Sequence, residues 1–266
     1  MHGGDFGGYA KKIWTAEEKG GELTLHYMSL AGEGGYPGDL KVAVTYGLSE
    51  KNELVIRYEA VANGDTICNL SQNTYFNLEG FSSGSVLDQK VQIFAAKYTP
   101  TDNESIPDGR ILLVEGTPLD FSEPTEIGAR IDAPFSQVRW AGGYDHNFAL
   151  DKTPAAEEAK ALGLGTDSDC PVDYSRLHKM AYAVSDKTGI ELHSYTTQPG
   201  VQFYSGNHLD GVLRGKAGMV FGPRAGFTLE AQYYPDAVHH MNFEQPLLRS
   251  GDTWTAETVY AFGVKE

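Results

Sequence analysis

The chain has 266 residues, enough to bury a large core within one domain. Its 21 basic and 36 acidic side chains give a formal charge of −15, with no basic run to displace counterions, so nucleic acid is not an expected partner. No apolar run approaches the roughly 20 residues that cross a bilayer and no secretory signal is visible, so neither membrane nor secretion is expected and a cytoplasmic location is predicted.

Apolar and polar residues alternate with period two along much of the chain. This alternation is typical of strands in antiparallel sheets, in which one face is buried and the other is exposed to solvent. The clearest alternating segments are residues 23–27, 40–46, 54–59, 180–184, 190–195 and 254–260. The turn residues 186–189 separate two of these segments and predict a β-hairpin.

One short helix is expected, over residues 154–164, where alanine and glutamate are dense. Polar loop residues surround it, which favours a place on the surface. No repeat, linker or low-complexity tract divides the chain, so residues 1–266 are expected to form a single all-β domain, a mostly antiparallel β-sandwich. Cys68 and Cys170 lack metal-ligand spacing and are expected to be reduced thiols.

Two short patterns are set aside. Residues 80–84 fit GxSxG, but a nucleophile elbow needs a helix after the serine, and the next residues indicate a turn and a strand instead. His239 and His240 are adjacent, so their side chains point apart in an extended segment and do not make a metal site.

Other segments concentrate the groups that bind sugars: carboxylates, amides, imidazoles and aromatic rings. These segments are residues 1–4, 69–80, 143–148 and 226–232. Buried polar residues in β-proteins are often only structural, so composition alone leaves a structural role open. Glu230 ends an apolar strand, where burying an unpaired carboxylate would be costly, and this favours a functional role.

Seven motifs, in this order along the chain, resemble those of the aldose 1-epimerase family. They are HGG (2–4) followed by KIW (12–14), EGGYPG (33–38), NLSQNTYFNLEG (69–80), IPDG (106–109), GYDHNF (143–148), PGVQFYSGN (199–207) and LEAQYYPDA (229–237). The resemblance implies a galactose-mutarotase-like β-sandwich of the supersandwich type. It also implies an enzyme that interconverts the α and β anomers of an aldohexose such as galactose or glucose.

Roles for individual residues follow from this resemblance alone. Glu230 matches the family's glutamate base, Asp145 the aspartate that binds sugar hydroxyls, and His2 the histidine near the ring oxygen. The reaction needs one proton acceptor and one proton donor, so neither a metal nor an organic cofactor is implied. His146 and Asn147 are expected to brace a neighbouring loop, and His208 to be peripheral.

The sequence departs from the family at two points. Asn73 stands where the family has its acid histidine; its amide can donate a hydrogen bond to the sugar but has no proton to transfer near neutral pH. The chain also starts at the HGG motif, so the family's preceding strands, with an arginine that helps hold the sugar, are absent. That absence predicts an unpaired sheet edge, which would favour a homodimer or lower the solubility.

Three hypotheses about function remain open at this point. In the first, the chain is an aldose 1-epimerase in which His2, or solvent, supplies the acid. In the second, it is a mutarotase-like carbohydrate-binding protein without useful catalysis. In the third, the fold serves a different chemistry on a sugar or another cyclic substrate, because fold does not fix function.

Overall fold

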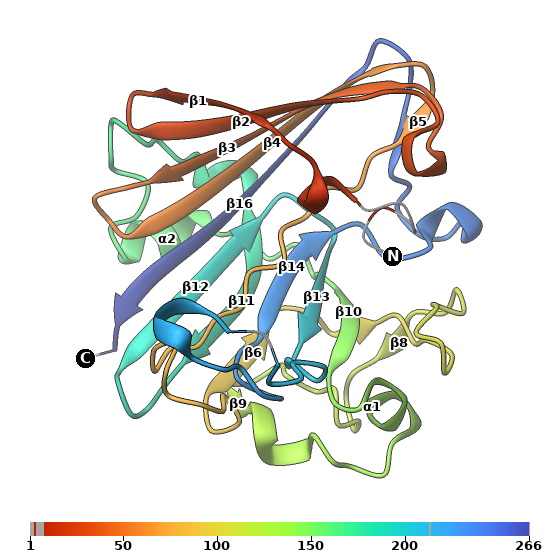
Figure 1. Ribbon diagram of the computed structural model, residues 1–266. Helices are drawn as coiled ribbons and strands as arrows, with labels where there is room; N and C mark the ends of the chain where they lie inside the picture. Colours follow the sequence, from red (N-terminus) through yellow and green to blue (C-terminus); the bar gives the residue numbers. More distant parts are fainter. Residues whose placement is uncertain (1–2, 4–7, 213, 266) are drawn as a thin grey trace.

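The alternating segments become strands of two large antiparallel sheets in the computed structural model, which describes residues 3, 8–212 and 214–265 (Figure 1). Within these residues the larger sheet has nine strands. In spatial order they are β1 (Thr15–Lys19), β2 (Glu22–Ser29), β3 (Asp39–Leu48), β4 (Glu53–Asn63), β16 (Thr253–Val264), β12 (Ile190–Thr196), β11 (His178–Val184), β6 (Lys90–Ile93) and β9 (Thr125–Glu126).

The second sheet has fewer strands and shares a core with the first. Its five described strands are, in spatial order, β14 (Thr228–Gln232), β13 (Gly200–Tyr204), β10 (Asp145–Ala149), β7 (Lys97–Tyr98) and β8 (Leu112–Leu113). A further pair joins β15 (Leu247–Leu248) to β5 (Thr66–Ile67). The two α-helices of the described chain are α1 (Ser136–Ala141) and α2 (Ala156–Ala161), and the 3-10 helices are η1 (Tyr9–Lys11), η2 (Glu33–Gly35), η3 (Ile127–Arg130), η4 (Tyr174–Arg176), η5 (Lys216–Gly218) and η6 (Ala237–His239).

A single core receives apolar side chains from both sheets. Ile56 and Tyr260 enter it from the nine-stranded sheet, and Phe148 and Phe203 enter it from the smaller one. The ring of Phe121 meets that of Phe203 edge-on, with ring centroids 5.2 Å apart. Each such buried aromatic side chain contributes about 1.5–3 kcal/mol to folding, so this shared core holds the two sheets together.

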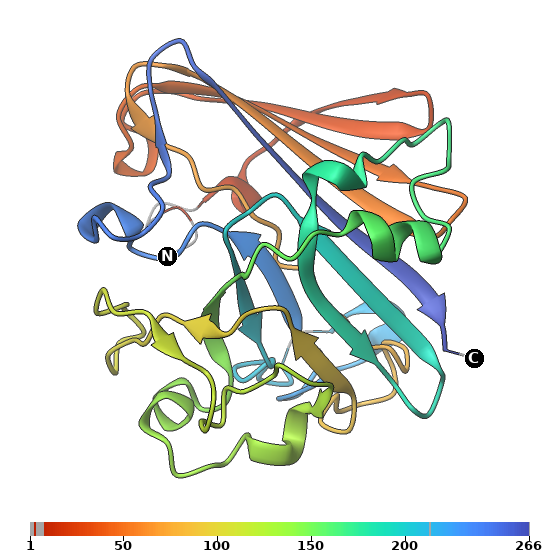
Figure 2. The ribbon, with the colours of Figure 1, turned by 180° about the vertical axis from the view of Figure 1, so that it is seen from behind.

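The far face of the nine-stranded sheet is also covered in its middle. Residues 155–177, which include α2 and η4, lie across it (Figure 2). Ala159 and Tyr174 of this segment pack in one buried cluster with Val55 and Val259 of the sheet. The central strands β4, β16 and β12 are therefore shielded on both faces.

These observations confirm the expected antiparallel β-sandwich and its alternating strands. The hairpin predicted at residues 186–189 joins β11 to β12, and the helix expected over 154–164 forms as the shorter α2. Helix α1 was not expected. The two cysteines are buried and free, as predicted. No helix in the described ranges has the length and apolarity needed to cross a membrane.

Candidate functional site

Two glycines carry the chain from α1 into β10. Gly142 has φ +64°, the left-handed conformation that commonly ends a helix. A Cβ on Gly143 would lie only 2.5 Å from Arg224 Nη1 and 2.6 Å from Asn207 Oδ1, so a larger residue would displace those side chains. The glycine pair of the GYDHNF motif thus fixes the point at which Asp145 begins β10.

Strand pairing places polar side chains in two rows on one face of the smaller sheet. Alternate residues of a strand share a face, and paired residues on neighbouring strands lie side by side. One row contains Asp145 of β10, Tyr204 of β13 and Thr228 of β14, and the next contains Asn147, Gln202 and Glu230 of the same strands. The intervening residues, such as Phe148 and Leu229, belong to the core. The face opposite the core is therefore the polar one.

Glu230 is a largely buried carboxylic acid in the middle of β14 rather than at its end. Burial raises its pKa to about 7; the charge of Asp145 adds to this rise, and a hydrogen bond from Thr228 opposes it. The Thr228 hydroxyl donates to Glu230 Oε1 over 2.8 Å. Near pH 7 the side chain is thus available in both its neutral and its ionised form, as a group that exchanges protons at that pH requires.

Asp145 lies close to this carboxyl and is held by its neighbour on β13. Gln202 Nε2 donates to Asp145 Oδ1 over 2.7 Å. The Oε1 atom of Gln202 and the Oδ1 atom of Asn147 are buried acceptors with no partner among the described residues. Buried acceptors are normally satisfied, so two of them on one polar face suit a ligand that carries hydroxyl donors.

His146 lies on the opposite face of β10 from Asp145 and is buried. Its Nδ1 accepts a hydrogen bond of 3.1 Å from the backbone N–H of Asp145. Burial lowers the pKa of His146 to about 4, so its imidazole is neutral at pH 7, and a backbone contact at Gln137 connects it to α1. His146 therefore contacts a helix, whereas a contact with a neighbouring loop was predicted.

The segment from residue 69 to residue 80 joins the same sheet beyond β14. Phe76 and Phe227 form an antiparallel bridge, with N···O distances of 2.8 and 3.0 Å in its two hydrogen bonds. Tyr75 consequently lies opposite Thr228, on the polar face. Gly226 makes room for this approach, since a Cβ there would lie 3.2 Å from the Cβ of Tyr75.

Asn73 is exposed in this segment, and its neighbour Gln72 is the residue that anchors the loop. Gln72 Oε1 accepts from the backbone N–H of Thr74 over 2.8 Å, and its Nε2 donates to the hydroxyl of Tyr260. Tyr260 in turn donates to the backbone carbonyl of Leu229 over 2.6 Å. The loop that carries Asn73 is therefore connected, through β16, to the residue next to Glu230.

Of the four residues singled out from the sequence, the structure brings Glu230 and Asp145 together on one face. Asn73 lies on the adjoining loop, and His2 falls outside the described residues. Sequence reasoning did not single out Gln202 or Tyr75. Both lie in motifs that were recognised, but only the strand register reveals that they share a face with Glu230.

The patterns set aside from the sequence prove to be structural. Residues 80–84 form turns, and the strand β6 follows them instead of a helix. His239 is exposed and His240 is not, and both are paired with Asp236. Across the described ranges no cluster of three or more His, Cys, Asp or Glu side chains is arranged to hold a metal ion.

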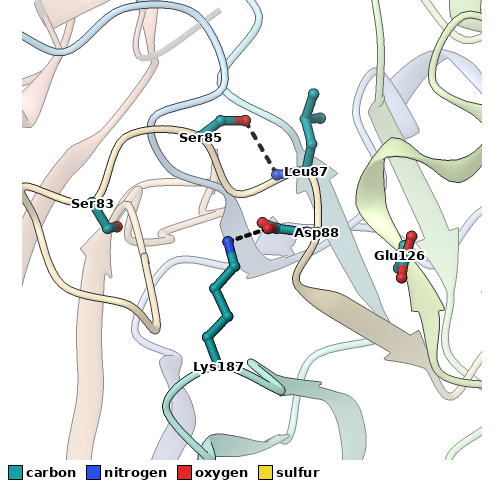
Figure 3. A pocket seen from close by; sticks show the side chains of 6 residues that line it. All are labelled: Ser83, Ser85, Leu87, Asp88, Glu126 and Lys187. Atoms are coloured by element: carbon teal, nitrogen blue, oxygen red, sulfur yellow. Dashed lines mark hydrogen bonds and ion pairs between the residues drawn. The ribbon is translucent and has the colours of Figure 1, made fainter.

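An open depression of about 410 Å³ near these turns contains none of the candidate residues (Figure 3). It is lined by Ser83, Ser85, Leu87, Asp88, Glu126 and Lys187. The ammonium group of Lys187 is paired with Asp88 and with Glu79. Its cation is thus already engaged by carboxylates of the protein.

Comparisons with known proteins identify relatives of the whole chain. The family model described as aldose 1-epimerase matches residues 1–261. A galactose mutarotase from Rattus norvegicus is 40% identical over 264 residues, which cover 99% of this chain and 69% of that protein. An aldose 1-epimerase from Escherichia coli is 32% identical, over 98% of this chain and 70% of that protein.

Solved structures with the same fold agree with these sequence matches. A galactose 1-epimerase from Lactobacillus acidophilus superposes with a TM-score of 0.74 at 26% identity, over 96% of this chain and 68% of that one. An aldose epimerase homologue from C. elegans gives a TM-score of 0.79 at 22% identity, over 96% of this chain and 70% of that one, which supports the fold alone.

Proposed function

This chain belongs to the aldose 1-epimerase family, and we propose that it interconverts the α and β anomers of an aldohexose such as galactose or glucose. The observation that carries the proposal is the pair of carboxyl groups on the polar face of β10 and β14. Glu230 is the largely buried one, with a pKa raised to about 7 by burial. Asp145, held by Gln202, is the other.

Glu230 acts as the base in the proposed mechanism. Its carboxylate removes the proton of the sugar's C1 hydroxyl while the C1–O5 bond breaks and a proton donor protonates O5, which gives the open-chain aldehyde. Rotation about C1–C2 turns the other face of the carbonyl toward O5. On reclosure O5 gives its proton back to the donor and Glu230 gives its proton back to O1, so the chemistry is balanced without a redox partner.

Asp145 and Gln202 hold the sugar in this proposal. The carboxylate of Asp145 accepts hydrogen bonds from hydroxyl groups, and Gln202 orients that carboxylate through the hydrogen bond that its Nε2 donates. Asn73 can donate a hydrogen bond from its amide but cannot transfer a proton, so it is proposed as a substrate-binding residue. His2 stays a prediction for the ring-oxygen side of the site.

Asn73 favours a second function as the alternative. In that function the chain binds a carbohydrate and converts its anomers slowly or not at all. Losing a general acid costs roughly 10²–10⁴-fold in rate, so solvent could still support weak activity. The variant Asn73→His separates the two functions. If the parent shows little turnover, a large gain in rate would indicate otherwise intact catalytic machinery, whereas a variant that stays inactive would favour the binding protein.

Polarimetry of freshly dissolved α-D-galactose and α-D-glucose tests the proposed function. We expect the protein to speed mutarotation and Glu230→Gln to lower the rate by at least roughly 10²-fold, because the amide cannot accept the proton. The matched control is Glu257→Gln, which removes another carboxyl whose pKa is raised by burial but which lies on β16, outside the site. The control should keep the parental rate.

Two results would contradict this expectation. Equal rates with and without the protein, together with sugar binding detected by calorimetry, would identify a binding protein. Full activity in Glu230→Gln would remove the proposed base. A cytoplasmic location and a homodimer stay predictions, the latter to be measured by light scattering.

A further inference from the structure

The described residues leave the proton donor of the proposed reaction unassigned, and Tyr75 is the side chain best placed to fill that role. Its position follows from the bridge between Phe76 and Phe227. Because Tyr75 is opposite Thr228, it is diagonal to Glu230 across the same pair of segments. Diagonal neighbours lie about 7–8 Å apart at their backbones, within reach of an aromatic side chain.

The Tyr75 ring also reaches toward β10. It meets the ring of Tyr204 edge-on, with centroids 6.2 Å apart and an angle of 73° between the planes. Tyr204 is the cross-strand partner of Asp145, the proposed sugar-binding carboxylate. Tyr75 is 44% exposed, so its side chain is in contact with solvent rather than sealed in the core.

The surroundings of Tyr75 differ on its two sides. On the site side the titratable neighbours are Tyr204, Glu230 and Asp145. On the other side it lines an apolar cavity of about 440 Å³ with Phe81, Phe221 and other uncharged residues. The charged groups near the phenol are therefore those of the sugar site itself.

We propose that Tyr75 is the catalytic acid that protonates the sugar ring oxygen, an inference that rests on the function proposed above. On ring opening, the Tyr75 phenol gives its proton to O5 as the C1–O5 bond breaks, and Glu230 takes the proton of the C1 hydroxyl. On ring closure, the O5 hydroxyl attacks C1 and returns its proton to the Tyr75 phenolate, while Glu230 protonates the carbonyl oxygen. No group is left changed at the end of the cycle.

The acidity of the phenol suits such a transfer. Burial, followed by the neighbouring groups of Tyr204 and Glu230, raises the pKa of Tyr75 to about 12, so the phenol is protonated at any pH at which the enzyme would work. The departing ring oxygen is an alkoxide, with a basicity comparable to that of hydroxide, whose conjugate acid has a pKa of about 15.7. Proton transfer from the phenol to that oxygen is thus downhill.

The test measures kcat and KM for mutarotation of α-D-galactose between pH 5 and pH 9. Tyr75→Phe keeps the ring and removes only the proton donor, so kcat should fall by roughly 10²–10⁴-fold with little change in KM. Adding Asn73→His to Tyr75→Phe should restore most of the lost rate. The restored activity should decline above about pH 6.5, because an imidazolium must be protonated to act as the acid.

Controls separate this role from a structural one. Tyr182→Phe removes a phenol on β11 that is hydrogen-bonded to Glu191, outside the site, and should leave the rate unchanged. Tyr75→His keeps an acid at position 75 and should retain activity, again with a decline above about pH 6.5. Melting temperatures and calorimetric sugar affinities show whether each variant is folded.

Specific outcomes would overturn the inference. A Tyr75→Phe rate within about twofold of the parent, with a large loss in His2→Gln, would give the acid role to His2. An equal loss from Tyr75→Phe with and without Asn73→His would mean that Tyr75 only shapes the site. Failure of the proposed function is distinct from both, since it appears as a parent protein that does not accelerate mutarotation or as an active Glu230→Gln variant.

Discussion

At the scale of single residues, neighbouring titratable side chains of the smaller sheet lie in different environments, because successive strand residues point to opposite faces. Asp145 faces the polar side, whereas His146, one position later, is buried on the other side with its pKa lowered to about 4 by burial. Glu230 pairs across strands with Gln202 and keeps partial contact with solvent. A shift of register by one residue would exchange these environments and eliminate the site.

The raised pKa of Glu230 links activity to stability. Its folded-state pKa of about 7 lies above the ordinary value of 4.5, so the folded state binds more protons than the unfolded state between those pH values. Its contribution to stability is therefore complete below about pH 4.5 and is lost as the pH rises through 7. The difference in unfolding free energy between Glu230→Gln and the parent should therefore shift in favour of the variant by about 1–3 kcal/mol as the pH is raised from 4.5 to 8.

Urea unfolding of both proteins across this pH range measures that difference. Glu257 is present in both proteins, so its own titration cancels. A pH-independent difference would mean that Glu230 has an ordinary pKa in the folded protein.

Part of the site could be predicted from the sequence. Glu230 and Asp145 could be singled out because each lies in a recognisable motif, and the structure places both on one face of the smaller sheet. Tyr75 and Gln202 lie in such motifs too, but their importance depends on which residues face one another across strands. That register is set by packing between segments far apart in the chain, which single-sequence periodicity does not encode.

At the scale of elements, the segment over residues 155–177 is held to the nine-stranded sheet by a buried carboxylate. Glu53 of β4 is fully buried, and its Oε1 accepts from the Tyr174 hydroxyl over 2.7 Å and from the Gly165 backbone N–H over 2.9 Å. Ser49 donates to its Oε2 over 2.6 Å. These donors balance the cost of burying the carboxylate and anchor the segment.

Removing one of these donors should loosen the anchor without touching the site. We expect Tyr174→Phe to cost about 1–3 kcal/mol, since Glu53 keeps its burial and loses a partner. For a chain of this size that corresponds to a fall in melting temperature of roughly 2–12 °C, measured by calorimetry. Tyr36→Phe, at an exposed position, is the control. An unchanged melting temperature in Tyr174→Phe would show that the anchor lies elsewhere.

The elements themselves were mostly predictable. Long alternating strands such as β3 and β4 have a periodicity that packing reinforces. Helix α1 escaped prediction because it is only 6 residues long, and its end is set by Gly142 rather than by any apolar stripe. Short helices gain little from propensity and depend on tertiary contacts.

At the scale of the whole molecule, protection from solvent is graded across the nine-stranded sheet. β1 is at one edge and all five of its side chains are exposed, whereas β4 and β16 lie near the middle with both faces covered. Local unfolding of an edge strand breaks few apolar contacts, whereas local unfolding of a central strand breaks many. The site is on the smaller sheet, which is packed against this protected middle through the shared core.

Amide hydrogen exchange followed by mass spectrometry should rank the strands accordingly. We expect peptides covering β1 to exchange first and peptides covering β4 and β16 last, close to the rate of global unfolding. Saturating galactose should slow exchange in β10, β13 and β14, because a ligand that binds only the folded state stabilises it. Equal protection in β1 and β16 would contradict the graded picture.

The position of β16 between β4 and β12 has a consequence for how the protein is made. Strands β4 and β12 are synthesised well before β16, the strand that pairs with both of them. Val55 of β4 pairs with Val259 of β16 only when β16 has left the ribosome. Because synthesis proceeds at roughly 5–20 residues per second, the edges of β4 and β12 that face β16 stay unpaired for at least several seconds. During that interval the nascent chain is a natural client for chaperones, and the arrival of one late strand closes the sheet.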